Sequence, residues 1–225
     1  MKRTDFDKYA ADYNDLLHRE TQFFSDDESY FARYKVEITR RLVTQPPGRL
    51  LEFGCGIGRN IPYLREAFPG SEVMGCDVSA KSVELARAAN PGVDFWTEGE
   101  GGAGERGFDL IFVAGVFHHI PPEERPEAAA LIAHRLNPGA MVVVFEHNPY
   151  NPITRRIVNE CPYDEDAVLL SARELRGRLA GAGLQFRKQG YALFFPPKLA
   201  AFVRLEPLLA WLPLGGQYWV CAARP

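Results

Sequence analysis

A short apolar segment that runs directly into alternating glycines constrains this chain more than any other feature. Residues 50–53 form an apolar run of strand length that contains one acidic residue, Glu52, and Gly-x-Gly-x-Gly follows at residues 54–58. Apolar residues then recur at helical spacing over residues 61–68. Alternate glycines let the backbone bend sharply and approach a ligand where a Cβ atom would collide, and the next helix begins with unpaired N–H groups. The pattern predicts a strand, a glycine turn and a helix beside a nucleotide-like ligand.

The glycine spacing distinguishes two kinds of nucleotide site. A dinucleotide fingerprint requires Gly-x-Gly-x-x-Gly, but Arg59 stands where its third glycine should be. The stretch instead resembles motif I of the class I S-adenosylmethionine-dependent methyltransferases, in which an acidic residue precedes Gly-x-Gly-x-Gly. This resemblance implies that Glu52 positions the ammonium group of the cofactor. It also implies that the turn lies beneath the methionine part of the cofactor, through Gly54, Cys55, Gly56 and Gly58.

Composition and charge narrow the class of protein. At 225 residues, with 46% hydrophobic and 24% charged residues, the chain fits one medium domain. A formal net charge of -3 gives no general attraction to nucleic acid or to an anionic membrane. The polar N-terminus and the absence of any run of about 18 apolar residues argue against a signal peptide and a membrane span. The four cysteines lack metal-ligand spacing, which favours reduced thiols, a cytoplasmic location and no metal.

Two helices are predicted within residues 3–45, ahead of the first strand, from apolar residues at every third or fourth position. In the resembled family such helices fold over the cofactor as a lid. The resemblance implies that Tyr13, in a Tyr-Asn pair, lines the cofactor, and the cluster at residues 30–35 is a candidate for the same wall. The alternative is a helical cap whose aromatic side chains only pack on the sheet.

Asp77 ends the second predicted strand, residues 72–77. A carboxylate at a strand tip can accept two hydrogen bonds from vicinal ribose hydroxyls, so Asp77 is the candidate ribose ligand, and Val78 would then contact the adenine. The alternative is that Asp77 only opens the turn before a helix capped by Ser79.

The third predicted strand, residues 93–97, is followed by Glu98 and Gly99. In the resembled family an acidic residue near this position receives the adenine amino group, a donor that needs an acceptor. Glu98 resembles that residue, with Gly99 beside it. A solvated acidic loop that also contains Glu100 and Glu105 is the competing interpretation.

Histidines follow the fourth and fifth predicted strands. Residues 108–114 form a continuously apolar strand, which is typical of burial on both faces, and the cofactor is expected to contact Ala114 at its end. His119 is a candidate general base because the pKa of histidine lies near neutrality, although it also fits a role in holding the pocket wall. His147, after the strand at residues 141–145, is the rival base, and Glu146 beside it is expected to face the cofactor; a polar strand end held by prolines is the alternative.

The C-terminal part of the chain contains more large apolar side chains than its predicted helices and strands need. A capping box at Ser171 and Glu174 begins a helix, residues 185–195 have strand character, and residues 217–223 form the last strand. Between these strands, residues 196–216 hold more large apolar side chains than one helical stripe needs. This insertion is interpreted as a wall for an apolar acceptor, a dimer contact or a covered extension of the core.

Alternating strands and helices predict a parallel sheet with right-handed crossovers and a ligand at the carboxyl ends of its strands. The expected fold class is α/β, a Rossmann-like three-layer sandwich. Its seven-stranded sheet is mostly parallel, with the last-inserted strand antiparallel. The single domain, residues 1–225, comprises a helical cap (1–47), a cofactor-binding core (48–150) and a C-terminal half (151–225) with the 196–216 insertion.

The resemblance implies a methyltransferase that uses S-adenosylmethionine and releases S-adenosylhomocysteine. A small, partly apolar acceptor and a monomer or homodimer are expected, with no nucleic-acid partner. Two alternatives stay open: a protein that binds the same cofactor for other chemistry or regulation, and a nicotinamide oxidoreductase, which Arg59 disfavours.

Overall fold

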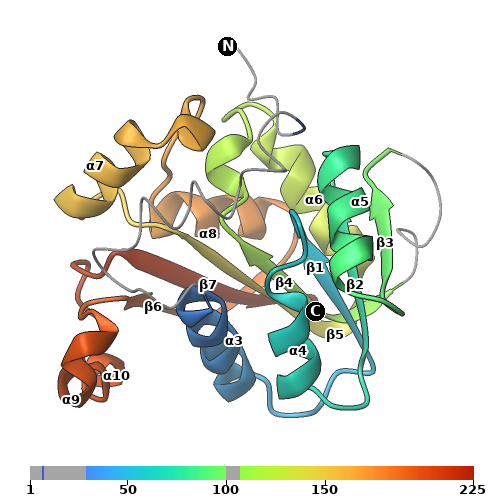
Figure 1. The fold of residues 1–225 in the computed structure, drawn as a ribbon, viewed down its shortest axis with the longest axis horizontal. Helices are drawn as coiled ribbons and strands as arrows, with labels where there is room; N and C mark the ends of the chain where they lie inside the picture. The colour runs from blue at the N-terminus through green and yellow to red at the C-terminus, as the bar shows by residue number, and fades with distance from the viewer. Residues whose placement is uncertain (1–6, 8–28, 100–106) are drawn as a thin grey trace.

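The computed structural model describes residue 7, residues 29–99 and residues 107–225, and a seven-stranded sheet forms its centre (Figure 1). The order in the sheet is β3-β2-β1-β4-β5-β7-β6. Only β7 runs antiparallel to its neighbours β5 and β6, which confirms the predicted sheet. The strands are β1 (Arg49–Phe53), β2 (Glu72–Asp77), β3 (Asp94–Thr97), β4 (Phe108–Ala114), β5 (Leu136–His147), β6 (Gln185–Ala192) and β7 (Gln217–Ala223).

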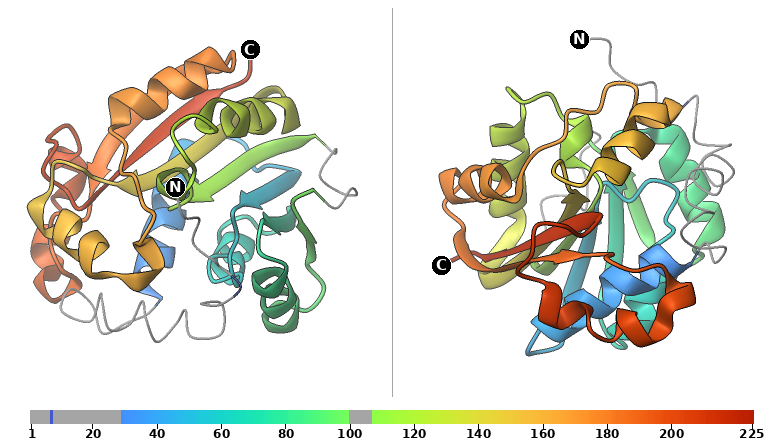
Figure 2. Two further views of the ribbon diagram at one scale, coloured as in Figure 1. Left: turned by 90° about the horizontal axis from the view of Figure 1, so that it is seen from above. Right: turned by 90° about the vertical axis from the view of Figure 1, so that its left-hand side faces the viewer.

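Helices cover both faces of the sheet, as Figure 2 shows, so the predicted three layers are present. One face is covered by α3 (Tyr30–Leu42), α4 (Ile61–Ala67) and α5 (Ala80–Ala89). The other face is covered by α6 (Arg125–Arg135) and α8 (Ala172–Gly181). Beyond the end of β5 lies α7 (Pro152–Glu160), followed by the short 3₁₀ helix η3 (Pro162–Asp164).

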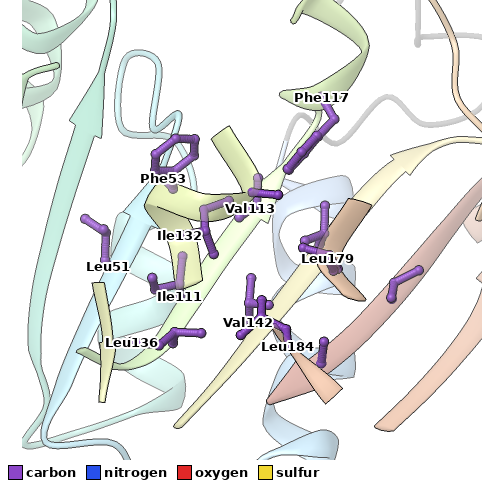
Figure 3. Packing of buried hydrophobic residues seen from close by; sticks show 14 of the residues in the cluster. Leu51, Phe53, Ile111, Val113, Phe117, Ile132, Leu136, Val142, Leu179 and Leu184 are labelled. Carbon is purple, nitrogen blue, oxygen red and sulfur yellow. The ribbon is translucent and has the colours of Figure 1, made fainter. Parts of the chain in front are cut away.

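The core has two parts because side chains of the central strands alternate between the faces of the sheet. In β4, Ile111 and Val113 pack with Ile132 of α6 and Leu179 of α8 (Figure 3), whereas Phe112 packs on the opposite face. Such a strand, apolar on both faces, is typical of a parallel sheet covered by helices. The packing fixes the carboxyl ends of the parallel strands, where the site residues were predicted.

Several boundaries differ from the expected ones. Strand β5 begins at Leu136 because this residue pairs with Phe108, ahead of a register shift in β4. Strand β6 ends at Ala192 because Leu193 has a φ of 62°, which turns the chain out of the sheet. The first predicted N-terminal helix, with Tyr13, lies outside the described residues.

The insertion at 196–216 does not extend the core. It contains η4 (Pro197–Leu199) and two helices of one turn each, α9 (Ala200–Val203) and α10 (Glu206–Leu209). Leu208 and Trp211 are 70% and 74% exposed. The interpretation of a covered core extension is therefore wrong, because single turns cannot present a continuous apolar stripe to the sheet.

A buried carboxylate anchors this insertion. Glu206 is buried and accepts hydrogen bonds from the N–H groups of Phe194 and Phe195, both at 2.9 Å. It also accepts a hydrogen bond from the Tyr34 hydroxyl of α3. This contact was not predicted, because a glutamate in an apolar segment is usually solvated.

All four cysteines lie in the described parts of the chain, and none of them forms a disulfide bond. Among the described helices, none combines the length and the apolar character needed to cross a membrane.

Candidate active site

A cavity of about 650 Å³ lies at the carboxyl ends of the parallel strands. Its walls come from the glycine turn after β1, the tips of β2, β3 and β4, helices α3 and α6, and the segment around Tyr163. Of the predicted site residues, Glu52, Gly58, Gly99 and His147 do not line it. The predicted residues that line it are Gly54, Cys55, Gly56, Asp77, Val78, Glu98, Ala114 and His119.

The glycines of the turn have distinct roles. All three have positive φ, at 73° for Gly54, 51° for Gly56 and 79° for Gly58. A Cβ on Gly54 would lie 2.3 Å from Val116 Cγ2, and one on Gly58 would lie 2.6 Å from Asn90 Nδ2. Gly56 lines the cavity, and no atom of the described residues lies within 4 Å of the position of its Cβ. Two glycines therefore permit close packing, and the middle one leaves room for a ligand against the backbone.

Asp77 is fixed at the tip of β2 by the backbone. Its Oδ2 accepts a hydrogen bond from the Gly56 N–H at 2.7 Å, and its Oδ1 accepts one from the Ser79 N–H at 2.9 Å. Burial raises the pKa of Asp77 above its ordinary value, while these N–H groups act in the opposite direction. The structure thus combines the two interpretations of the sequence, since Asp77 organises the turn and also lines the cavity.

Glu52 lies beneath the turn as a buried carboxylate with one unused oxygen. It is 1% exposed, its Oε1 accepts a hydrogen bond from Asn60 Nδ2, and its Oε2 has no hydrogen-bond partner among the described residues. Burial raises its pKa to about 8. Lys35 of α3 lines the cavity nearby, and burial, together with the charge of Arg59, lowers its pKa to about 8. The proximity of Lys35 to Glu52 was not predicted, because they come from different elements.

Glu98 lines the cavity while bonded to helix α6. Its Oε1 and Oε2 accept hydrogen bonds from Arg135 Nη1 and Nη2 at 2.7 and 2.9 Å. Burial acts to raise its pKa, but the bonds from Arg135 outweigh it and hold the pKa below its ordinary value. Contact between Glu98 and an adenine amino group stays a prediction.

His119, in the 3₁₀ helix η2 (Phe117–His119) after β4, forms part of the cavity wall. Its Nδ1 lies 3.2 Å from Asp166 Oδ1, and its Nε2 lies 3.3 Å from Asp164 Oδ1. Burial and the neighbouring His118 lower the pKa of His119, so its ring is mainly neutral near pH 7. The two aspartates were not predicted as site residues, because they follow α7 in a segment without a recognisable motif.

Glu146 and His147 do not face the cavity, contrary to the expectation from the sequence. Glu146 is 1% exposed and accepts hydrogen bonds from the Val116 and Phe117 N–H groups at 2.9 and 2.6 Å. Its other oxygen lies 2.6 Å from His118 Nδ1. His147 packs edge-on against His118, and burial, together with the charge of His118, lowers its pKa to about 4. These residues therefore form a layer behind the cavity wall.

Comparison with known proteins identifies the family. A family model described as a methyltransferase domain matches residues 51–142, which include the glycine turn, Asp77 and His119. Trans-aconitate 2-methyltransferase from Azoarcus sp. (strain BH72) is 30% identical over 160 residues, which cover 67% of this chain and 61% of that protein. Probable tRNA methyltransferase 9B from Bos taurus is 28% identical over 134 residues, which cover 59% of this chain and 28% of that protein. The chain thus spans less than two thirds of the length of these relatives.

A solved structure supports the same fold. The structure of a SAM-dependent methyltransferase from Thermotoga maritima, described as a possible histamine N-methyltransferase, matches with a TM-score of 0.68. It is 17% identical, and the match covers 98% of each chain. The family model over residues 51–142, the related sequences and this fold together support a class I S-adenosylmethionine-dependent methyltransferase.

Proposed function

We propose that this protein transfers a methyl group from S-adenosylmethionine to a small-molecule acceptor. The observation that carries this proposal is the shared cavity of about 650 Å³, which joins the glycine turn and Asp77 on one side to His119 on the other. A nucleotide-type binding turn and a proton acceptor thus line the same cavity, as group transfer between two bound reactants requires.

The described residues fit the cofactor. The space beside Gly56 suits the amino-acid tail, since no atom of the described residues lies within 4 Å of the position where a Cβ would be. Glu52 Oε2, buried and unbonded among the described residues, is an acceptor for an ammonium group. Asp77 would accept hydrogen bonds from the ribose hydroxyls. Gly56 and Asp77 line the cavity, and Glu52 lies directly beneath the glycine turn.

When bound, the cofactor supplies a methyl group already activated by the positive charge on sulfur. The protein's task is then to align the acceptor and to exclude water. Val116, Ile120 and Leu131 contribute apolar side chains to the cavity wall, which suits both tasks. A neutral His119 has one unprotonated ring nitrogen. It would take the proton that an attacking hydroxyl or amine loses once that nitrogen turns from Asp164 or Asp166 toward the acceptor.

A small organic acceptor is favoured over a nucleic acid. The formal net charge is -3, which gives no general attraction to a polyanion. Lys35 contributes a cationic group to the cavity, which suits a carboxylate-bearing acceptor. The Azoarcus relative is named for trans-aconitate, a small carboxylic acid, which agrees with this choice. The bovine relative is named for tRNA, so tRNA belongs in the test as the competing acceptor.

Two measurements test the proposal. In isothermal titration calorimetry we expect binding of S-adenosylmethionine and S-adenosylhomocysteine, and none of NAD. Release of S-adenosylhomocysteine is then followed with a panel of di- and tricarboxylates, phenols, amines and tRNA. Turnover with a small molecule is expected. Turnover with tRNA alone would overturn the acceptor class, and cofactor binding without any turnover would favour a binding or regulatory role.

A further inference from the structure

A second group of residues, behind the cavity wall, has the composition of a metal site. His118 of η2, His147 at the end of β5 and Asp164 at the end of η3 each offer a ligand atom, and these atoms lie within 4.8 Å of one another. His118 is 2% exposed, and the side chain of Asp164 is 10% exposed. One buried and one half-buried imidazole with a half-buried carboxylate differ from the exposed acidic clusters that are common on protein surfaces.

The distances suit direct coordination. His118 Nε2 lies 3.5 Å from Asp164 Oδ1. In a tetrahedral site with bonds of about 2.1 Å, two ligand atoms are about 3.4 Å apart. These two atoms therefore already have the separation of ligands on one ion, and a small side-chain movement would bring His147 to the same distance.

His118 is oriented by a residue outside the group. Glu146 Oε2 lies 2.6 Å from His118 Nδ1, while Glu146 Oε1 is held by two backbone N–H groups. Metal-binding histidines generally have the second ring nitrogen bonded to a carboxylate or carbonyl, which fixes the ring orientation. Glu146 thus leaves Nε2 of His118 directed toward Asp164.

Asp164 is held close to the histidines by contacts along its own segment. The Val168 N–H donates to the His118 carbonyl at 2.8 Å, and Arg125 of α6 donates to the Val168 carbonyl. Arg125 also donates to the Ile120 carbonyl at 3.0 Å. The segment that carries Asp164 is therefore tied to the turn that carries His118. Glu146, next to His147 in β5, bonds the same turn through the Val116 and Phe117 N–H groups, so the three ligands are carried by segments that are bonded together.

We propose that His118, His147 and Asp164 bind one divalent transition-metal ion next to the cavity. Imidazole nitrogens together with a carboxylate favour zinc and similar ions, whereas magnesium prefers oxygen ligands alone. Three protein ligands leave a coordination position open for water or a ligand oxygen. His119, in the cavity wall, lies 3.3 Å from the same Asp164 oxygen, so the ion is adjacent to the proposed acceptor side. The proposal does not depend on methyl transfer.

The test uses untagged, full-length protein treated with a chelator and then dialysed. Titration calorimetry with zinc is expected to show one equivalent bound, and magnesium under the same conditions is expected to bind far more weakly. Cobalt absorption spectroscopy reports the geometry independently, since four-coordinate cobalt gives intense visible bands. Both readouts are made without S-adenosylmethionine.

Variants assign the ligands. His147→Ala and Asp164→Asn should each weaken zinc binding by roughly 100-fold or more, and Glu146→Gln by about 10- to 100-fold through misorientation of His118. His134→Ala, an exposed histidine of α6, is the matched control and should bind as the unmodified protein does. Circular dichroism checks that each variant is folded, and His147→Gln replaces His147→Ala if the latter is not.

Failure to bind zinc more tightly than magnesium would overturn the proposal. It would equally be overturned if zinc binding survived both His147→Ala and Asp164→Asn, or if His134→Ala removed it. In those cases the group is only a hydrogen-bonded network that supports His119.

Discussion

The two sides of the cavity hold their polar groups differently. Among the described residues on the side of the glycine turn, Asp77 is bonded only to backbone N–H groups, and Glu52 keeps one oxygen unbonded. On the histidine side, side chains are paired with one another, as His118 with Glu146 and His119 with Asp164. The first side therefore leaves polar groups available to a ligand, whereas the second is a pre-formed network that positions one residue in the wall.

Two buried glutamates show the same contrast. Glu52 in β1 and Glu146 in β5 are each 1% exposed. Burial raises the pKa of Glu52 to about 8. Burial also acts on Glu146, but the charge of His118 and its hydrogen bonds outweigh it and hold the pKa below the ordinary value. Equal burial thus has opposite consequences, depending on whether the protein itself supplies the donors.

The largest effect is expected from His119→Ala. With an acceptor found in the panel, kcat should fall by about 100- to 10,000-fold, because a positioned proton acceptor is lost. The dissociation constant of S-adenosylmethionine should barely change, since His119 belongs to the histidine side. Steady-state kinetics and calorimetry measure the two quantities, and His134→Ala serves as the control. A large loss of cofactor affinity with unchanged kcat would show that His119 serves cofactor binding, which contradicts the division of the cavity into a glycine-turn side and a histidine side.

Gly54→Ala should have the next largest effect. A Cβ at this position would lie 2.3 Å from Val116 Cγ2, and the residue has a φ of 73°. Strain and overpacking together should lower the free energy of unfolding by roughly 4 kcal/mol and abolish cofactor binding. Urea unfolding measures the first effect and calorimetry the second.

Gly70→Ala is the matched control for this change. Gly70 has a φ of 91°, but no atom lies within 4 Å of the position of a Cβ, so only the backbone strain applies. A loss of roughly 1 kcal/mol is expected, with cofactor binding retained. Equal losses in both variants would show that contact with Val116 does not matter.

The same division explains what the sequence could predict. Gly54, Gly56 and Asp77 follow directly from strands β1 and β2, so local spacing was enough to place them at one edge of the sheet. Asp164 and Asp166 come from the segment after α7, and only the tertiary fold brings them to His119. The periodicity and spacing of the sequence cannot predict this contact with His119, because it depends on how the fold positions η3 relative to η2.

The fold shows a similar limit. Alternating apolar strands and helices predicted the parallel sheet, because burial on both faces requires those patterns, whereas the antiparallel β7 was expected from the resemblance to the methyltransferase family. The interpretation of the insertion at 196–216 as a covered extension of the core was wrong, because apolar composition does not reveal whether helices are long enough to bury an apolar face. Its anchor, Glu206, is a polar residue bonded to Tyr34, far away in the sequence.

Glu52→Gln should make the ligand-free protein more stable than the wild type, and this difference in the free energy of unfolding should grow as pH rises. The folded-state pKa of Glu52 is raised from 4.5 to about 8, so between these values the folded protein retains a proton that the unfolded chain releases. Wild-type stability therefore falls from about pH 5 to about pH 8, and glutamine removes this loss. The variant should gain about 3 kcal/mol relative to wild type over that interval.

Urea unfolding at both pH values tests this, with Glu84→Gln on α5 as the control for removing one negative charge. Calorimetry should also show weaker binding of S-adenosylmethionine by Glu52→Gln, because the ammonium group loses a charged acceptor. If Glu52→Gln is more stable than the wild type but binds S-adenosylmethionine more weakly, Glu52 serves ligand binding and not the stability of the fold. A variant that is less stable at the higher pH would place Glu52 among the internally satisfied residues, like Glu146.

The smallest effect, and the sharpest test of the comparison, is expected from Asp77→Asn. This change keeps the shape of the side chain but removes the charge that would accept ribose hydroxyls, so cofactor affinity should weaken by about 1–2 kcal/mol, measured by calorimetry. Asp109→Asn is the matched control, because Asp109 Oδ2 also accepts two backbone N–H groups, from Gly48 and Arg49, both at 2.9 Å. Both variants weaken hydrogen bonds from backbone N–H groups, so Asp109→Asn shows what that weakening alone does to cofactor affinity. Only Asp77→Asn should lose affinity, because Asp77 alone of the two lines the cavity; equal affinities would mean that Asp77 serves the turn and not the ligand.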